Sequence, residues 1–168
     1  MPDLFPPRLT DRAASLLQLY RRKDVRIATA ESCTGGLIIA LLTEIAGSSD
    51  VVERGFVTYS NDAKMQLLGV SAATLATDGA VSEQTALEMA EGALSHSEAD
   101  IAVSVTGVAG PGGGSEAKPV GLVHFACAGP GVRRVTAVRR FGDLGRSGIR
   151  MASLEQALDL LEAAANSL

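Results

Sequence analysis

Apolar residues recur at helical spacing near the start of the chain and then give way to short β-branched runs. The first helix is predicted to end near residues 21–23, and its apolar face consists of Leu9, Ala13, Leu16, Leu17 and Tyr20. A strand is predicted over residues 25–30, and a polar turn separates it from the apolar helical stretch 37–45. The pattern predicts the order helix, strand, turn, helix.

The middle of the chain predicts a second strand and three more helical segments. The strand covers residues 51–60, and a polar break separates it from a short helix around Lys64. Residues 71–75 predict another helical turn. Ser82 is a suitable N-cap for the next helix. The apolar stripe of that helix contains Ala86, Leu87, Met89, Ala90, Ala93 and Leu94.

The second half of the chain is richer in strands. A strand over residues 101–106 is followed by a glycine-rich loop over 107–119. Two further strands, over 120–128 and 132–141, are separated by Gly-Pro-Gly and predict a hairpin. The closing helix covers about residues 146–165. Its apolar face consists of Met151, Leu154, Leu158 and Leu161.

Helices and strands alternate early in the chain, whereas a hairpin comes late. This order favours an α/β fold, a three-layer α/β/α sandwich with a mixed, mostly parallel sheet of about five strands including the C-terminal hairpin. Residues 8–168 are expected to form one domain. Residues 1–7 carry three prolines and are expected to form an extended tail.

Composition and charge exclude several classes of protein. With 46% hydrophobic and 20% charged residues the chain is globular, and a net charge of −4 without a basic run argues against nucleic-acid partners. No apolar stretch is long enough for a membrane span and no secretory signal is recognisable, so we expect no membrane partner and a cytoplasmic location. The two cysteines and two histidines lack metal-ligand spacing. We therefore expect no metal site and no cofactor, while the sequence leaves carboxylate-bound magnesium open.

Residues 30–36, Ala-Glu-Ser-Cys-Thr-Gly-Gly, connect the first strand to a helix and present two hydroxyls and a thiol. Backbone N–H groups at the start of a helix favour a developing oxyanion or a bound phosphate, and glycine lets a substrate approach the backbone. Ser32 is therefore a candidate nucleophile. Taken alone, this stretch is better explained by helix capping, the commoner role of such a hydroxyl.

Tyr59 and Lys64 bring a phenol and an amine to the next strand-to-helix junction. A serine hydroxyl needs a base before it can attack an amide, and a buried lysine with a depressed pKa serves where no histidine is suitably placed. The alternative is that Lys64 is a solvated helix residue and that Tyr59 packs at a strand end, which is the usual position of both types.

A glycine-rich loop, residues 106–115, follows the third predicted strand directly. Successive backbone N–H groups in such a loop can form an anion-binding nest. The loop lacks the Gly-Lys-Ser/Thr ending of an ATP-hydrolysing P-loop, and a strand rather than a helix follows it, which also argues against a dinucleotide-binding turn. The other interpretation is a mobile connecting loop.

Together these three stretches resemble the CinA C-terminal domain family, the nicotinamide-mononucleotide deamidases. The matching segments are 30–36, Tyr59-Ser60-Asn61 with Lys64, and 106–111 leading to 119–121. The resemblance covers about residues 8–165 and is to the stand-alone form, without the molybdopterin-binding-like domain of many members. It implies hydrolysis of the carboxamide of nicotinamide mononucleotide to nicotinic acid mononucleotide and ammonia, without a metal.

The resemblance also implies roles for individual residues. Ser32 matches the family's nucleophile, Lys64 its general base, and Tyr59 a hydroxyl that assists the proton transfer or orients the pair. Where members have Gly-Asp-Arg, residues 142–146 are Gly-Asp-Leu-Gly-Arg, and Arg146 is the candidate phosphate contact. The other residues expected to bind the oxyanion or the substrate are Cys33, Thr34, Gly35, Gly36, Asn61, Thr106, Gly107, Ala109 and Gly110.

Other interpretations stay open at this point. Cys33 is a rival nucleophile because a helix N-terminus lowers the pKa of a thiol, although neither His96 nor His124 is close to it in sequence. A non-catalytic nucleotide-binding or regulatory module would hold a nucleotide without turning it over. A purely scaffolding domain leaves the grouping of Ser32, Tyr59 and Lys64 unexplained. Small aliphatic helix faces favour a homo-oligomer.

Overall fold

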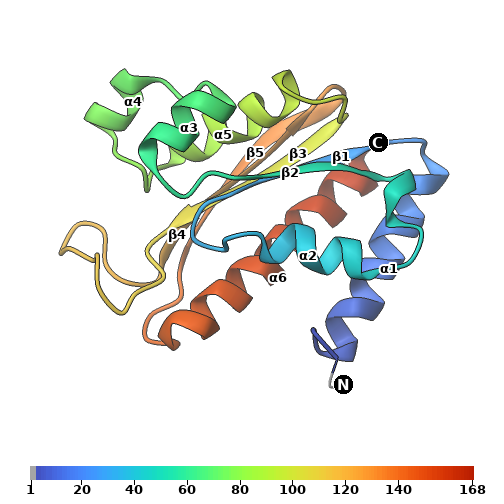
Figure 1. Cartoon of the computed structure of the whole chain (residues 1–168), viewed down its shortest axis with the longest axis horizontal. Helices are drawn as coiled ribbons and strands as arrows, with labels where there is room; N and C mark the ends of the chain where they lie inside the picture. The colour runs from blue at the N-terminus through green and yellow to red at the C-terminus, as the bar shows by residue number, and fades with distance from the viewer. Residues whose placement is uncertain (1–2) are drawn as a thin grey trace.

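The computed structural model describes residues 3–168, apart from the side chain of Arg133. Five strands form one sheet in the order β2-β1-β3-β4-β5, and helices cover both of its faces (Figure 1). The strands are β1 (Ile27–Glu31), β2 (Val52–Val57), β3 (Ile101–Gly107), β4 (Leu122–Gly129) and β5 (Val132–Arg140).

The sheet is mixed. Strand β1 pairs in parallel with β2 and β3, whereas β4 is antiparallel to both β3 and β5. The parallel pairs arise because helices connect their strands, and the β4–β5 hairpin returns the chain without a helix. The three-layer mixed sandwich is confirmed. Parallel pairings do not outnumber antiparallel ones, because the last two strands are joined by turns.

The helices divide between the two faces of the sheet, α1, α2 and α6 on one side and α3, α4 and α5 on the other (Figure 1). Of the expected extended tail, residues 1 and 2 lie outside the described part, Phe5 is buried and Pro7 already begins a helix. The helices are α1 (Pro7–Arg22), α2 (Leu37–Glu44), η1 (Ser48–Asp50), α3 (Asn61–Leu68), α4 (Ala72–Thr77), α5 (Glu83–Ser95) and α6 (Gly145–Ser167).

Alternating residues of the central strands face two different cores, as the period of two in a strand requires. Large residues such as Ile27 and Val103 face α1, α2 and α6, whereas Ala28 and Ala102 face α3 and α5. The small side chains of Ala28 and Ala102 let α3 and α5 pack closely against the sheet. A Cβ on Gly92 of α5 would lie 1.9 Å from the carbonyl oxygen of Leu68, so α5 meets the end of α3 backbone to backbone. This contact supports the helix that carries Lys64.

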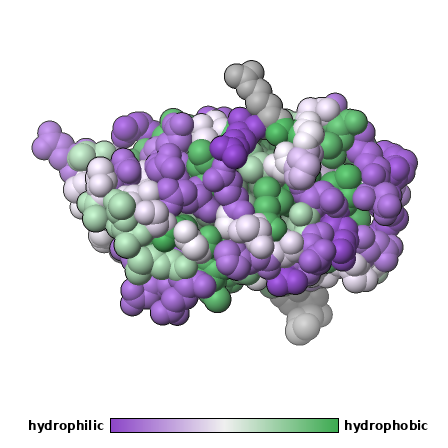
Figure 2. Space-filling view, turned by 90° about the horizontal axis from the view of Figure 1, so that it is seen from above, coloured by the Kyte–Doolittle hydropathy of each residue, from purple (hydrophilic) through white to green (hydrophobic). Residues whose placement is uncertain are grey.

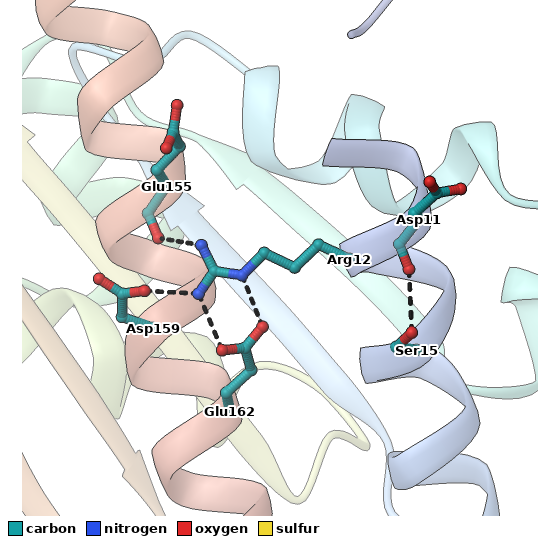
Figure 3. A network of polar contacts seen from close by, with 6 residues as sticks. All are labelled: Asp11, Arg12, Ser15, Glu155, Asp159 and Glu162. Atoms are coloured by element: carbon teal, nitrogen blue, oxygen red, sulfur yellow. Dashed lines mark hydrogen bonds and ion pairs between the residues drawn. The ribbon is translucent and has the colours of Figure 1, made fainter. Parts of the chain in front are cut away.

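An arginine holds α1 against α6 on the lower face (Figure 3). The Arg12 guanidinium donates to both carboxylate oxygens of Glu162, at 2.6 and 2.8 Å, and to Asp159. The Tyr20 hydroxyl, which is fully buried, donates to the carbonyl oxygen of Leu161 at 2.8 Å. Polar contacts thus fix the packing of the two long helices.

The surface on the side of α3, α4 and α5 is mostly hydrophilic, with hydrophobic residues scattered across it (Figure 2). Among residues 3–168, no helix combines the length and apolar character that crossing a membrane requires.

Candidate active site

The three parallel strands end at one edge of the sheet, where α/β proteins commonly bind their ligands. The segments that follow β1, β2 and β3 surround a cavity of about 280 Å³. The predicted site residues that line it are Ser32, Cys33, Tyr59, Asn61, Lys64, Thr106, Gly107, Ala109, Gly110 and Arg146. Thr34, Gly35 and Gly36 lie outside its wall, in the turn behind Ser32.

Ser32 and Lys64 meet at the inner end of this cavity. Their Oγ and Nζ atoms form a hydrogen bond of 2.9 Å, and Nζ also donates to the carbonyl oxygen of Thr58 at 2.8 Å. Lys64 is 1% exposed and Ser32 is 8% exposed. The interpretation of Lys64 as a solvated helix residue is therefore wrong.

Local sequence explains why Lys64 points inward. Ser60 is the N-cap of α3, and its hydroxyl accepts from the N–H of Ala63 at 3.0 Å, which fixes the first helical turn. Lys64 lies in that turn, directly above the end of β1. Burial lowers the pKa of its amine, and within residues 3–168 the amine forms no ion pair that would restore the charge. A neutral amine next to a serine hydroxyl has the properties of a general base.

The turn that carries Ser32 is held by the buried carboxylate of Glu31. This carboxylate accepts from the N–H groups of Gly36 and Ile38, each at 3.1 Å, and of Ile39 at 2.9 Å. A side chain of the protein thus occupies the N-terminus of α2, the place expected for an oxyanion.

The expected oxyanion donors are consequently reduced in number. The N–H of Gly35 donates to the carbonyl oxygen of Ser32 at 3.0 Å, and that of Gly36 donates to Glu31. Gly35 and Gly36 instead shape the turn, with φ angles of +60° and +96° that side chains rarely adopt. In residues 3–168 the N–H groups of Cys33 and Thr34 donate to no other residue, but only Cys33 lines the cavity, whereas Thr34 is fully buried. The N–H of Cys33 is therefore the donor in this turn that lies next to the cavity.

Cys33 lies in the cavity wall next to Ser32 but is a poor nucleophile. Cys33 is 5% exposed, and burial raises the pKa of its thiol to about 11. The raised pKa keeps Cys33 protonated at neutral pH. Because the thiolate is the reactive form of cysteine, the protonated thiol is a poor nucleophile.

Tyr59 is placed differently from the expectation that it assists proton transfer between Ser32 and Lys64. Its side chain is exposed, and its hydroxyl accepts a hydrogen bond of 2.8 Å from the Arg146 guanidinium. Arg146 also donates to the carbonyl oxygen of Gly110 at 2.7 Å. The pair closes the outer side of the cavity and links α6 to the glycine-rich loop.

The remaining wall combines apolar and cationic groups. Ala80, Val81 and Val108 supply apolar surface, and the Thr106 hydroxyl donates to the carbonyl oxygen of Ala80 at 2.7 Å. Lys64 and Arg146 line the cavity without an acidic side chain among their lining neighbours. Such a wall suits a small anionic molecule with a flat apolar part. No three His, Cys, Asp or Glu side chains in the described chain come together as metal ligands.

Comparison with known families agrees with this geometry. The model of the CinA C-terminal domain matches residues 9–165. The chain belongs to the CinA C-terminal domain family. A crystal structure of the competence/damage inducible protein CihA from Agrobacterium tumefaciens superposes with a TM-score of 0.95 and is 53% identical, covering 98% of this chain and 99% of that one.

Relatives in the CinA C-terminal domain family carry several kinds of name. The nicotinamide-nucleotide amidohydrolase PncC of Enterobacter agglomerans is 52% identical over 145 residues, which are 86% of this chain and 87% of that protein. PncC of Escherichia coli K12 is 56% identical over 120 residues, 70% of this chain and 73% of that protein. The CinA-like protein of Syntrophobacter fumaroxidans is 51% identical, but the match spans only 33% of its length. The chain thus corresponds to one part of such longer relatives.

The structure also places three residues at the site to which the sequence analysis assigned no role. Glu31 is in the recognised motif, but its function as the carboxylate that holds the turn depends on a buried geometry. Arg150 is one helical turn beyond Arg146 on α6, and this spacing is the only sequence signal for it. Thr58 contributes its carbonyl oxygen to Lys64, and its own buried hydroxyl has no partner in the described residues.

Proposed function

We propose that this member of the CinA C-terminal domain family hydrolyses the carboxamide of nicotinamide mononucleotide to nicotinic acid mononucleotide and ammonia. The observation that carries the proposal is the buried Lys64 amine at 2.9 Å from the Ser32 hydroxyl. The names of relatives more than 50% identical to this chain support the substrate class.

In the first step Lys64 acts as the general base. Its Nζ takes the proton of Ser32 Oγ while Oγ attacks the carboxamide carbon, and the carbonyl oxygen becomes an oxyanion. Burial favours the neutral amine that this step needs. The carbonyl oxygen of Thr58 keeps Nζ directed toward Ser32.

The N–H of Cys33 is the proposed donor to the oxyanion, because Cys33 lines the cavity and its N–H donates to no other residue of the described chain. Donors that are fixed before the reaction stabilise developing charge at little further cost. Gly35, Gly36 and Glu31 shape the turn that presents this donor.

The second half of the reaction returns the proton and adds water. The Lys64 ammonium protonates the departing nitrogen, which leaves as ammonia, and the substrate carbonyl remains bound to Ser32 as an ester. Lys64, again neutral, deprotonates a water molecule that attacks this ester. The carboxylic acid product leaves, and Ser32 recovers its proton.

The cavity wall supports an anionic substrate with a flat ring. Arg146, held by Tyr59, is the proposed partner of the phosphate, and the apolar residues Ala80 and Val81 offer a surface for the pyridine ring. Asn61 and the backbone of residues 107–113 complete the wall.

The test is ammonia release from nicotinamide mononucleotide in the presence of EDTA, with free nicotinamide as a second substrate. The proposal predicts stoichiometric ammonia and nicotinic acid mononucleotide from the nucleotide, and much slower release from nicotinamide, which lacks the phosphate. Saturable binding of the nucleotide by folded protein without ammonia would contradict it and favour a binding module.

A further inference from the structure

The glycine-rich loop between β3 and β4 projects beyond the ends of the strands that it connects (Figure 1). Residues 107–110, 112 and 113 of this loop line the cavity, whereas its last part, residues 115–118, does not. Since residues 111–117 are exposed, the position of the loop depends on where its two ends are attached.

Two side-chain hydrogen bonds attach the loop to other elements of the described chain. Near its start, Arg146 of α6 donates to the carbonyl oxygen of Gly110 at 2.7 Å. At its end, the Lys118 ammonium donates to the carbonyl oxygen of Asp78, which lies between α4 and α5. Because α5 and α6 cover opposite faces of the sheet, the two bonds attach the loop to both layers of helices (Figure 1).

Local structure directs Lys118 toward the segment between α4 and α5. The N–H of Ser115 donates to the carbonyl oxygen of Lys118 at 2.9 Å, and its hydroxyl accepts from the N–H of Lys118 at 3.0 Å, which closes a tight turn. A Cβ on Gly79 would lie 2.8 Å from the Lys118 Nζ, so the ammonium occupies space that a side chain would fill. Gly79 also has a φ of +79°, which favours glycine.

The segment that Lys118 contacts continues into the cavity wall. Three consecutive carbonyl oxygens of this segment accept hydrogen bonds from side chains. They are those of Asp78, Gly79 and Ala80, and the donors are Ser82, Thr85, Thr106 and Lys118. Ala80 and the next residue, Val81, line the cavity. Lys118 is the donor that comes from the glycine-rich loop, and it therefore connects one part of the wall, residues 80–81, to another, residues 107–113.

Lys118 makes no contact with the groups that hold the reacting pair. Lys64 donates to Ser32, and the turn that carries Ser32 is held by Glu31 and by Arg150. Arg150 donates to the carbonyl oxygens of residues 33 and 34, at 3.2 and 2.8 Å. Loss of the Lys118 side chain should therefore alter the wall and leave the reacting pair in place.

We propose that Lys118 is a positioning residue for substrate binding, which fastens the glycine-rich loop to residues 78–81 so that both parts of the wall contact the nucleotide. The proposal rests on the proposed function. Because Lys118 acts on the wall, its loss weakens the binding of substrate and transition state alike, which raises KM and leaves kcat unchanged. A residue that only stabilises the fold would instead lower the unfolding temperature and leave KM unchanged.

The experiment compares steady-state kinetics of the wild type, Lys118→Met and Lys118→Arg with nicotinamide mononucleotide. Lys118→Met keeps an unbranched chain but removes the donor, and KM is expected to rise about tenfold, as for the loss of one partly exposed hydrogen bond from a charged group. Lys118→Arg keeps a cationic donor and is expected to restore most of this loss.

A binding measurement separates affinity from turnover. The dissociation constant of nicotinamide mononucleotide is measured by calorimetry in Ser32→Ala and in the double variant with Lys118→Met, neither of which forms the acyl-enzyme. It is expected to rise by the same factor as KM. An unchanged dissociation constant overturns the proposal.

Arg21→Met is the matched control, because Arg21 also donates to a loop carbonyl, that of Gly47 at 2.8 Å, and lies outside the cavity wall. Its KM and kcat are expected to equal those of the wild type. A fall in kcat at unchanged KM in Lys118→Met, or a KM of Lys118→Arg as high as that of Lys118→Met, also overturns the proposal. If Lys118→Met does not fold, Lys118→Gln decides, since an unchanged KM in this neutral variant has the same meaning. Inactivity of the wild type contradicts the proposed function, whereas the dissociation constants still decide the role of Lys118.

Discussion

Lys64 and Arg12 are basic side chains bound to neighbouring elements, yet their surroundings differ in charge. Lys64 is buried, and among the described residues its amine bonds to a hydroxyl and a carbonyl oxygen but to no carboxylate, and burial lowers its pKa. Arg12 is partly exposed and contacts two carboxylates, and its hydrogen bonds to Glu162 are the main cause that raises its pKa (Figure 3).

The comparison distinguishes a basic side chain that can take part in the reaction from one that holds two helices together. A cation with carboxylate partners keeps its charge and fastens α1 to α6. An amine that is buried without a carboxylate gives up its proton more readily, which destabilises the fold but provides a base. Polar contacts of similar length therefore have different functions. Charged partners keep the basic group charged, whereas uncharged partners leave it able to act as a base.

The largest expected effect follows from removing the nucleophile. In Ser32→Ala the acyl-enzyme cannot form, and we expect kcat to fall by ~10⁴-fold or more. The variant removes one small hydroxyl, so its thermal unfolding should stay close to that of the wild type. Ammonia release at more than one per cent of the wild-type rate would rule out Ser32 as nucleophile.

The next effect concerns the base. Lys64→Met is expected to lower kcat/KM by ~10²- to 10⁴-fold at neutral pH. In the wild type kcat/KM should rise with pH until the amine is neutral, and the midpoint should lie below 10.5, the ordinary value for lysine. The variant should lack this rise. A wild-type profile that is flat from pH 5 to 10 would show that Lys64 does not act as the base.

The same lysine predicts a dependence of stability on pH. Because burial lowers the pKa in the folded state, unfolding takes up a proton at any pH between the folded value and the ordinary 10.5. The free energy of unfolding of the wild type, relative to Lys64→Met, should therefore rise with pH across that window, by at most about 1.4 kcal/mol per pH unit. Urea denaturation of both proteins at several pH values measures it. A difference that falls with rising pH would mean that Lys64 is charged in the folded protein.

The smallest expected effect concerns Arg12, which fastens α1 to α6. Arg12→Met should lower the free energy of unfolding by about 1 kcal/mol, since the pairs with Asp159 and Glu162 are partly exposed. High salt should reduce this loss, and kcat should not change. A large fall in kcat would remove the distinction between the two basic residues.

Much of the fold could be predicted because periodicity is a local property. The strand at residues 101–106 and the helices around Lys64 and after Ser82 are observed close to their predicted places, and Ser82 caps α5 as expected, accepting from Thr85 at 3.1 Å. The balance of parallel and antiparallel pairings could not be predicted equally well. It depends on how the last strands return, which local patterns do not specify.

The candidate site was predictable where its motifs follow strand ends, since the ends of parallel strands meet in space. The hydrogen bonds within it were less predictable. Tyr59 bonds to Arg146, which is 87 positions away, and the N–H of Gly36 is taken by Glu31. Both depend on side-chain directions that only the packed structure defines. The same reason explains why Arg150 carried no clear signal.

The most direct test of the account is the identification of the covalent intermediate. Rapid acid quenching of the enzyme with nicotinamide mononucleotide, followed by peptide mass spectrometry, is expected to find the acyl group as an ester on Ser32 in both the wild type and Cys33→Ser. The ester should be absent from Ser32→Ala and should accumulate when deacylation is slowed. An adduct on Cys33 that disappears in Cys33→Ser together with the activity would contradict the assignment of Ser32 and Lys64 as the reacting pair.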